Sequence, residues 1–248
     1  MDERLVRVIP NGILPARLVQ YAAMKNIPAL LASLLCLGAT AAAPDTVLLE
    51  ELTSPEVVAR VAGGTRTILI PIGGTEQNGE VMVLGKHNVR AKVLAEEIAR
   101  RLDMTLVAPV IAYVPEGSID PPTGHMRGAG TISIPAGAFE QTLEGAARSL
   151  LRHGFTAVIL LGDHGGYHGS LRRVAERINR ELKRTAILVP KEYYRELEHA
   201  GKADTQLSLA VDPKLVRNPA GASVEAGRAA REDIVESTVR SVRQALAR

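Results

Sequence analysis

The sequence has almost no cysteine and few aromatic residues. Of its 248 residues, one is cysteine (Cys36), none is tryptophan, and Phe, Trp and Tyr together make up 3%. A single cysteine excludes an intramolecular disulfide and a zinc site built from cysteines. So few rings leave little material for a nucleic-acid surface that works by base stacking. Any bound metal must therefore be held by His, Asp or Glu.

The chain also lacks a strong excess of charge of either sign. It has 30 Lys and Arg against 27 Asp and Glu, a formal net charge of +3, so no nucleic acid or other polyanionic partner is implied. At 46% hydrophobic and 23% charged, the composition suits one α/β domain, or two small ones, and not a disordered chain. The phosphate-binding motif G-x-x-x-x-G-K-[ST] and the serine-hydrolase motif G-x-S-x-G are absent as well.

An apolar run near the N-terminus has the features of an export signal. Met24, Lys25 and Asn26 precede an apolar stretch from Ile27 to Leu37, and small residues then lead to Ala43. These are the three parts of a secretory signal peptide, and the run is too short to span a bilayer. A buried core helix is the alternative interpretation. We predict an upstream extension over residues 1–23, a signal peptide over 24–43, and a working domain over 44–248. Cleavage near Ala43 would give a periplasmic protein without a membrane span, whereas an unused signal would leave it in the cytoplasm.

Beyond residue 44, short apolar runs alternate with segments of helical period. The apolar runs predict strands at residues 67–72, 105–113, 131–134, 157–161 and 186–189. The periodic segments predict helices near residues 88–103, capped by Asn88, and near 138–153, 171–184 and 223–247. This alternation indicates a single α/β domain with a mainly parallel sheet and helices on both faces. Ligands of such sheets bind at the carboxyl ends of the strands.

Titratable residues embedded in glycines follow two of the predicted strands. Glu76 lies in the segment 73–79 after the first strand, with His87 a little further on, and His164 lies in the segment 162–169 after a later strand. Taken alone, Glu76 is explained equally well by a helix or turn cap, and His164 is explained better by a hydrogen-bonded turn histidine. Together at neighbouring strand ends, they favour a metal or acid–base site.

Two further polar stretches are candidate substrate loops. Residues 115–128 form a long predicted loop, and long loops in compact domains are usually functional. Residues 198–205 place His199 and Asp204 five positions apart, across a glycine turn. Each stretch, considered alone, is explained somewhat better by a solvated surface loop.

The motifs resemble, in their order along the chain, those of the creatininase (creatinine amidohydrolase) family. They are Ile70-Pro71-Ile72-Gly73-Gly74-Thr75-Glu76-Gln77-Asn78-Gly79, Gly130-Thr131-Ile132-Ser133, Gly162-Asp163-His164-Gly165-Gly166, and His199-Ala200-Gly201 through Asp204-Thr205. The resemblance implies a metal-dependent amidohydrolase with an α/β fold that acts on a small-molecule substrate. It also implies a homo-oligomer, which in the family is a hexamer.

The resemblance carries over only part of the family's two-metal centre. Glu76 and His164 match a Glu and a His ligand. Asn78 stands where the family has a His, His87 where it has a bridging Asp, and Gly166 where some members have a Glu. A neutral imidazole presents one lone pair and cannot bridge two cations as a carboxylate does. We therefore expect one divalent ion held by Glu76, His87 and His164, with Zn²⁺ favoured and Mn²⁺ or Fe²⁺ also suited to these ligands.

The remaining roles follow from the same resemblance. His199 is expected to donate a proton to the leaving nitrogen, with Asp204 fixing its tautomer, while a metal-bound water is the nucleophile. Asp163 and Asn78 are expected to support the metal ligands from behind. Substrate contacts are expected from three residues of the long loop: Glu116, His125 and Arg127.

The leading hypothesis is thus a metal-dependent hydrolase of a C–N bond in a small cyclic or linear amide. The alternative is a degenerate family member that binds a metal or small ligand without turnover, since several family ligands have changed together. A third hypothesis, a phosphate- or nucleotide-binding domain using Gly73-Gly74, explains the glycines and leaves His87, His164 and His199 without a role.

Overall fold

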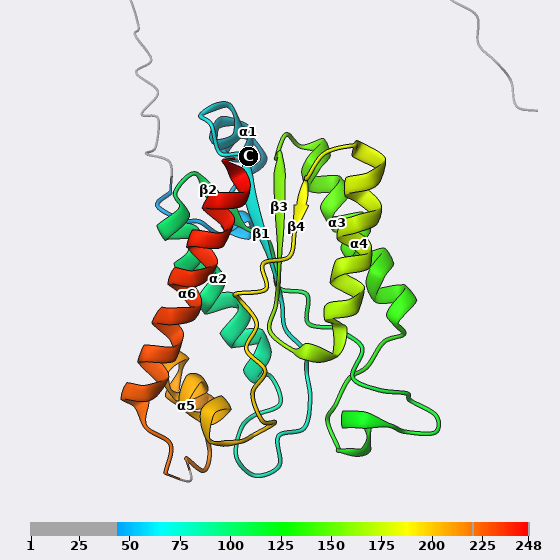
Figure 1. The fold of residues 1–248 in the computed structure, drawn as a ribbon, viewed down its shortest axis with the longest axis vertical. Coiled ribbons are helices and arrows are strands. Elements are labelled where there is room, and N and C mark those ends of the chain that lie inside the picture. Colours follow the sequence, from blue (N-terminus) through cyan, green and yellow to red (C-terminus); the bar gives the residue numbers. More distant parts are fainter. Residues whose placement is uncertain (1–43, 220, 248) are drawn as a thin grey trace, which may run out of the picture. The chain divides into compact units, whose positions relative to one another are not determined.

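A computed structural model describes residues 44–219 and 221–247, so the predicted extension and signal peptide lie outside the described residues. Four parallel strands form one sheet in the order β2-β1-β3-β4 (Figure 1). The strands are β1 (Thr67–Ile72), β2 (Thr105–Val107), β3 (Ala157–Gly162) and β4 (Ile187–Leu188). The α-helices are α1 (Ser54–Ala62), α2 (Lys86–Leu102), α3 (Ala136–Arg152), α4 (His168–Leu182), α5 (Lys202–Val211) and α6 (Val224–Leu246).

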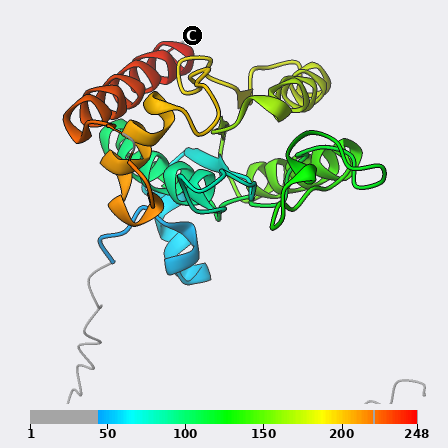
Figure 2. The same ribbon diagram turned by 90° about the horizontal axis from the view of Figure 1, so that it is seen from below.

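Helices cover both faces of the sheet. Ile68, Ile70 and Ile72 of β1 pack with α3 and α4, while Leu69 of the same strand packs with α2, α5 and α6. Figure 2 shows these two helix layers from below. The alternation follows from the pleat of a strand, whose successive side chains point to opposite faces. The predicted α/β domain, with its mainly parallel sheet between helices, is therefore confirmed.

Two predicted strands are wrong in extent. The strand predicted over residues 105–113 ends at Val107, because Pro109 follows and offers no N–H for a ladder. Residues 131–134 form isolated bridges to Thr75 and Val114 instead of joining the sheet. As a result, residues 108–135 form irregular chain beyond the carboxyl end of β1, apart from a short 3₁₀ turn at Gly124–Arg127.

The beginning of α2 also differs from the prediction. The helix starts at Lys86, and Asn88 is not its cap: the Asn88 side chain accepts a hydrogen bond from the Gly74 N–H at 2.9 Å and donates one to Thr75 Oγ1 at 3.2 Å. Asn88 therefore ties α2 to the loop that follows β1, which is the loop that carries Glu76.

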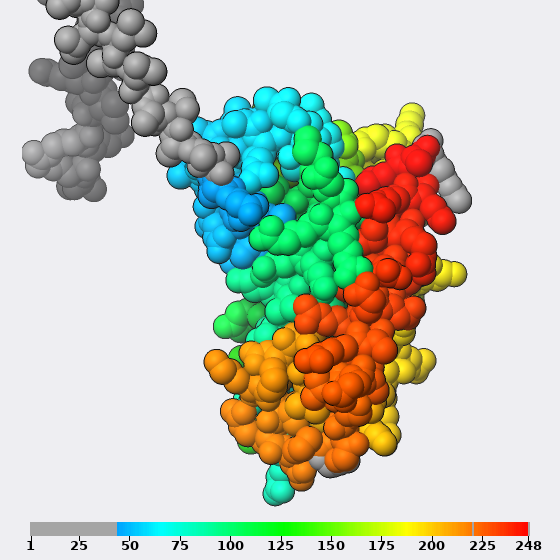
Figure 3. All heavy atoms as spheres, turned by 90° about the vertical axis from the view of Figure 1, so that its left-hand side faces the viewer, coloured from blue at the N-terminus to red at the C-terminus, as the bar shows by residue number. Residues whose placement is uncertain are grey.

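Helices α1 and α5 were not expected from the periodicity. A signal for α1 was present: the Thr53 N–H donates to the Glu56 carboxylate at 2.7 Å, and Pro55 lies in the first turn. Helix α5 packs against α6, and Figure 3 shows the two, in orange and red, covering one side of the molecule. None of the described helices is long and apolar enough to cross a membrane.

The close approach of α5 and α6 predicts opposite effects for two glycine-to-alanine changes. A Cβ on Gly227, in α6, would lie 1.9 Å from the Gln206 carbonyl oxygen of α5, whereas a Cβ on Gly145, in α3, meets nothing within 4 Å. Gly227→Ala is expected to lower the free energy of unfolding by roughly 1–3 kcal/mol through overpacking. Gly145→Ala, the matched control, is expected to raise it by about 0.5–1 kcal/mol. Chemical denaturation of both variants measures this difference, and equal effects would contradict the tight contact.

Candidate active site

The polar residues singled out in the sequence gather at the carboxyl ends of β1 and β3. Glu76 lies on the loop after β1, and His164 follows β3. Glu116 and His125 come from the irregular chain 108–135, and His87 comes from the first turn of α2. The carboxyl edge of the sheet is thus the site that its topology leads one to expect.

Tyr167 fixes the two strand ends relative to each other. Its buried hydroxyl lies 2.8 Å from the Ile72 oxygen and 2.7 Å from the Gly73 oxygen, and it accepts hydrogen bonds from the N–H groups of Asp163 and His164. One phenol therefore contacts the backbone on both sides of the site. This arrangement holds the loops carrying Glu76 and His164 in one geometry.

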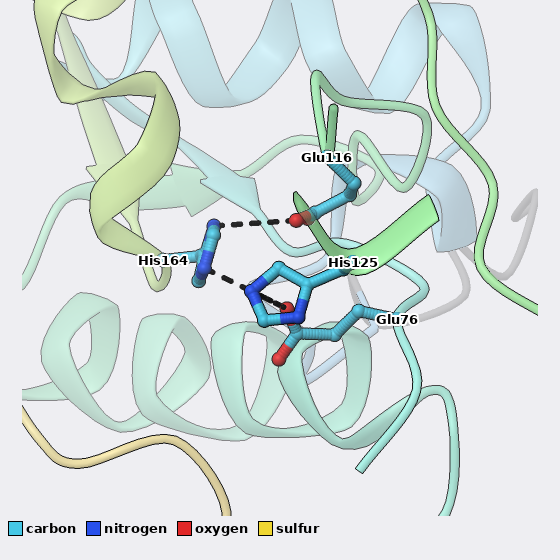
Figure 4. A group of neighbouring side chains, drawn as sticks. All are labelled: Glu76, Glu116, His125 and His164. Atoms are coloured by element: carbon cyan, nitrogen blue, oxygen red, sulfur yellow. Dashed lines mark ion pairs between the residues drawn. The ribbon is translucent and has the colours of Figure 1, made fainter. Parts of the chain in front are cut away.

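Four side chains from three separate segments form a compact cluster: Glu76, Glu116, His125 and His164 (Figure 4). One candidate ligand atom from each lies within 4.8 Å of all the others. Glu76 Oε2 is 3.2 Å from His125 Nε2 and 3.6 Å from His164 Nε2, while Glu116 Oε2 is 3.6 Å from His164 Nδ1. Two carboxylates and two imidazoles in this arrangement suit a divalent transition-metal ion.

Several buried atoms of this cluster have no hydrogen-bond partner. They are Glu76 Oε2, both carboxylate oxygens of Glu116, and His164 Nδ1. Buried polar groups are almost always hydrogen-bonded, because leaving one unpaired costs about 1–3 kcal/mol. Carboxyl oxygens and one nitrogen of a neutral imidazole offer lone pairs, and one such atom from each residue of the cluster lies within 4.8 Å of the others. A cation between them would give these buried groups a partner.

The pKa values of the cluster also fit a metal site. Burial, followed by the effect of His87, lowers the pKa of His164 from 6.5 to about 4, so its imidazole is neutral at pH 7, the form that binds metals. Burial and the nearby Glu76 raise the pKa of Glu116 from 4.5 to about 8. Burial alone would raise the pKa of Glu76, but hydrogen bonds from His199 and His87 outweigh it and hold that pKa well below its usual range.

His87, which the sequence placed among the metal ligands, has other partners in the structure. Its Nδ1 lies 2.6 Å from Asp163 Oδ2, and its Nε2 lies 2.9 Å from Glu76 Oε1. Both ring nitrogens thus face carboxylates, and Arg90 Nη2 also lies 3.0 Å from Nδ1. His125, predicted as a substrate contact, lies at the cluster instead, and so does Glu116. Asp163 was expected to orient an imidazole, and it contacts that of His87.

Asp204 and His199 lie on the other side of Glu76. We expected Asp204 to fix the tautomer of His199, but its carboxylate instead contacts Lys86 Nζ, Arg90 Nη1 at 2.6 Å and the Ala200 N–H at 3.1 Å. His199 Nδ1 is 3.3 Å from Glu76 Oε1, and the ring is one-third exposed to the site opening. His199 therefore combines access to solvent with contact to the buried carboxylate.

Of the two remaining predicted site residues, Asn78 is buried and Arg127 is exposed. Asn78 is buried, and its amide donates to the backbone oxygens of Glu76 and Val83, so it ties down the loop that carries Glu76. Arg127 is exposed and lines neither the cluster nor the neighbouring pocket in the part of the chain that the structure describes.

Sequence reasoning missed two buried cations, Lys86 and Arg90. Arg90 donates to Asp163 from Nε at 2.8 and 3.0 Å and to Asp204 from Nη1, and these carboxylates raise its pKa although burial lowers it. Their spacing alone gave no signal: residues four apart on a helix share one face, but exposed charges on a helix have the same spacing.

A pocket of about 460 Å³ opens beside the cluster. His125, His164 and His199 reach it from the cluster side, and the turn Gly165-Gly166 forms part of its wall. Residues 194–197, one continuous segment that precedes α5, also line it. Tyr194 of this segment packs on the ring of His168, with centroids 4.4 Å apart. The volume is in the range of roughly 300–1,000 Å³ that is usual for small-molecule sites.

The protein thus has a parallel sheet with a buried cluster of His and carboxylate side chains at its carboxyl edge, beside a pocket of small-molecule size. These features place it among α/β proteins with a candidate metal-dependent active site. The family model described as creatinine amidohydrolase matches residues 50–244. The chain therefore belongs to the creatininase family, as its motifs suggested.

Characterised relatives fall into two groups. The chain is 28% identical over 197 residues to the creatinine amidohydrolase of Pseudomonas putida, a match that covers 69% of this chain and 74% of that protein. It is 32% identical over 160 residues to the mycofactocin precursor peptide peptidase of Mycobacterium tuberculosis, covering 61% of each, which is less than two thirds of the peptidase. Both are named for hydrolysis of C–N bonds, and this supports a hydrolase.

Solved creatininases share the fold. One crystal structure of creatinine amidohydrolase superposes with a TM-score of 0.68 at 24% identity, covering 81% of this chain and 98% of that one. A mutant creatininase of a Zn–Zn type gives a TM-score of 0.69 at 23% identity, with coverages of 81% and 98%. A manganese form gives 0.64 at 24% identity, with coverages of 81% and 97%.

Proposed function

We propose that this protein is a metal-dependent amidohydrolase that cleaves a C–N bond of a small amide, using one divalent ion. The observation that carries the proposal is the set of unpaired buried lone pairs on Glu76, Glu116 and His164. We infer that these residues and His125 hold the ion. Zn²⁺ is favoured and Mn²⁺ is the first alternative, since both occur in solved creatininases and both accept nitrogen and oxygen ligands.

Such an ion supplies Lewis acidity to a carbonyl and to water. The residues of this chain prepare the rest of the site. Glu116 has a pKa of about 8 and holds a proton at neutral pH until an ion displaces it. His199 stands at the pocket with Nδ1 near Glu76 Oε1, in position to transfer a proton to the departing nitrogen.

The pocket supports a small substrate. Its volume of about 460 Å³ matches a lactam, a cyclic amide or a short peptide fragment better than a folded protein segment. The relatives include both a creatinine amidohydrolase and a peptide peptidase. We propose a small cyclic or linear amide outside a peptide chain as the substrate, and short peptides serve as the competing class.

Hydrolysis assays on a panel of cyclic amides, linear amides and short peptides test the proposal. We expect turnover of at least one small amide, loss of turnover after chelation, and recovery with Zn²⁺ or Mn²⁺. A bound ion without turnover of any member would favour the degenerate alternative, a binding protein. Turnover that survives complete removal of metal would contradict the proposed mechanism, and turnover of peptides alone would contradict the proposed substrate.

A further inference from the structure

The two oxygens of the Glu76 carboxylate have different surroundings. Three nitrogens surround Oε1: His87 Nε2 at 2.9 Å, His199 Nδ1 at 3.3 Å and Lys86 Nζ at 3.4 Å. Oε2 has no hydrogen bond, and the nitrogens near it, His125 Nε2 at 3.2 Å and His164 Nε2 at 3.6 Å, both belong to the candidate metal ligands. The ammonium of Lys86 thus lies on the Oε1 side of the carboxylate, and the candidate ligands lie on the Oε2 side.

Lys86 is the cation on the Oε1 side. Its side chain is 1% exposed, and Nζ reaches Glu76 and Asp204 from the first turn of α2. An ammonium is buried so deeply only when carboxylates compensate it. Arg90, one turn further along α2, pairs with Asp163 and with the other oxygen of Asp204. Among the described residues of this cluster, Lys86 is therefore the cation that faces Glu76.

A second metal ion on the Oε1 side would have to displace or closely approach this ammonium. Like charges at such distances repel strongly, and more so in a buried site with low effective dielectric constant. The other nitrogens on that side belong to His87 and His199, and each already faces Glu76 Oε1. The Oε1 side therefore resists a second divalent ion.

We propose that Lys86 is a positioning residue whose ammonium occupies the Oε1 side of Glu76 and so limits the site to a single metal ion bound at Oε2. The inference rests on the proposed metal site. In this arrangement a side chain of α2 supplies the positive charge that a second ion would otherwise bring. Lys86 also fixes the orientation of the Glu76 carboxylate, because Oε1 is held by three donors while Oε2 points at the cluster.

Metal stoichiometry tests the proposal without relying on activity. The full chain is dialysed against Mn²⁺, its metal content is measured, and electron paramagnetic resonance then distinguishes single ions from exchange-coupled pairs. We expect one equivalent and no coupled signal for the wild type. Lys86→Met removes the charge but keeps a long side chain, and we expect it to bind more than one equivalent and to show the coupled signal.

Two control variants show whether the effect requires the loss of a positive charge at position 86 itself. Lys92→Met makes the same change on α2, where Lys92 is 41% exposed and pairs with the exposed Glu50, and it is expected to keep one equivalent. Lys86→Arg retains a cation and is also expected to keep one equivalent. If Lys86→Met bound one equivalent with unchanged affinity, Lys86 would be only a structural ion pair and the proposal would fail.

The wild type alone keeps the proposal testable if Lys86→Met does not fold. Two equivalents bound to the wild type, or a coupled signal at saturating Mn²⁺, would overturn the role of Lys86 and leave the proposed hydrolase standing. No equivalent bound to the wild type would instead overturn the proposed metal site, and the role of Lys86 with it.

Discussion

Replacing His164 with alanine is expected to lower the affinity for a divalent ion by at least about a hundredfold, since loss of even an outer-shell partner costs 10–100-fold. The imidazole lies between the two carboxylates of the cluster, with Nε2 3.6 Å from Glu76 Oε2 and Nδ1 3.6 Å from Glu116 Oε2. Without it, three of the four candidate ligands remain. Hydrolysis should fall by roughly 10³-fold or more, because a Lewis acid contributes several kcal/mol of transition-state stabilisation.

The matched control is His153→Ala. His153 is an exposed histidine that caps the end of α3 and contributes nothing to the cluster. Isothermal titration with Zn²⁺ and steady-state kinetics on the same preparations measure both effects. Equal metal affinities for the wild type and His164→Ala would contradict the assignment of this site.

A comparison of His125 and His87 decides which imidazole completes the ligand set. His125→Ala should weaken metal binding in the same way as His164→Ala, because its Nε2 lies 3.2 Å from the unpaired Glu76 Oε2. His87→Ala should keep the stoichiometry at one ion, because both nitrogens of His87 face carboxylates. The opposite pattern would support the ligand set expected from the sequence, with His87 in place of His125.

The stability of the metal-free protein should fall by about 1–2 kcal/mol between pH 6.5 and 8, and Glu116 is the expected cause. Burial raises the pKa of this carboxyl from 4.5 to about 8, and Glu116 is only 4% exposed to solvent. In that window the folded protein retains a proton that the unfolded chain has already lost. Because the folded state binds more protons, the free energy of unfolding decreases as the pH rises toward 8.

Metal binding should also depend on the Glu116 proton, but the affinity should increase as the pH rises. An ion needs the Glu116 carboxylate, so each ion bound below pH 8 must release the proton. The apparent affinity is expected to rise roughly 15-fold from pH 6.5 to 8, because the gain of about tenfold per pH unit levels off as the pH reaches the pKa of about 8. Proton release appears in calorimetric titrations as a dependence of the binding heat on the ionisation enthalpy of the buffer.

Glu116→Gln provides the control for both effects of pH. The amide cannot titrate, so the difference between wild type and variant isolates Glu116 from the histidines, which begin to titrate near pH 6.5 in the unfolded chain. Urea denaturation of the two metal-free proteins at pH 6.5 and 8 measures this difference. An equal pH dependence in both would show that another group carries the proton.

The sheet was predictable where local sequence and tertiary environment agree. The run 67–72 is apolar after Thr67 and ends at Gly73-Gly74, and the structure has β1 at Thr67–Ile72. The run 131–134 also has strand composition, but it lies among the irregular loops beyond the sheet edge and forms only isolated bridges. Composition signals that a segment can pair, whereas the partner that it finds depends on the rest of the fold.

The site was predictable in its location and only partly in its membership. The carboxyl-end rule led directly to Glu76 and His164, because each follows a buried strand. That His125 reaches Glu76 depends on how residues 108–135 fold back, and no local pattern encodes that path. Lys86 and Arg90 resemble ordinary helical surface charges in the sequence, and only the packing of α2 against α5 buries them.

The wall of the pocket formed by residues 194–197 belongs to a single stretch of chain, whereas the four candidate metal ligands come from other loops. Part of the pocket surface and the candidate ligands are therefore encoded by separate stretches of the gene. Substitutions at residues 194–197 would change this surface while leaving the four candidate ligands and the nearby His199 in place. For protein engineering, a library confined to these four positions would sample substrate specificity with the candidate metal ligands unchanged.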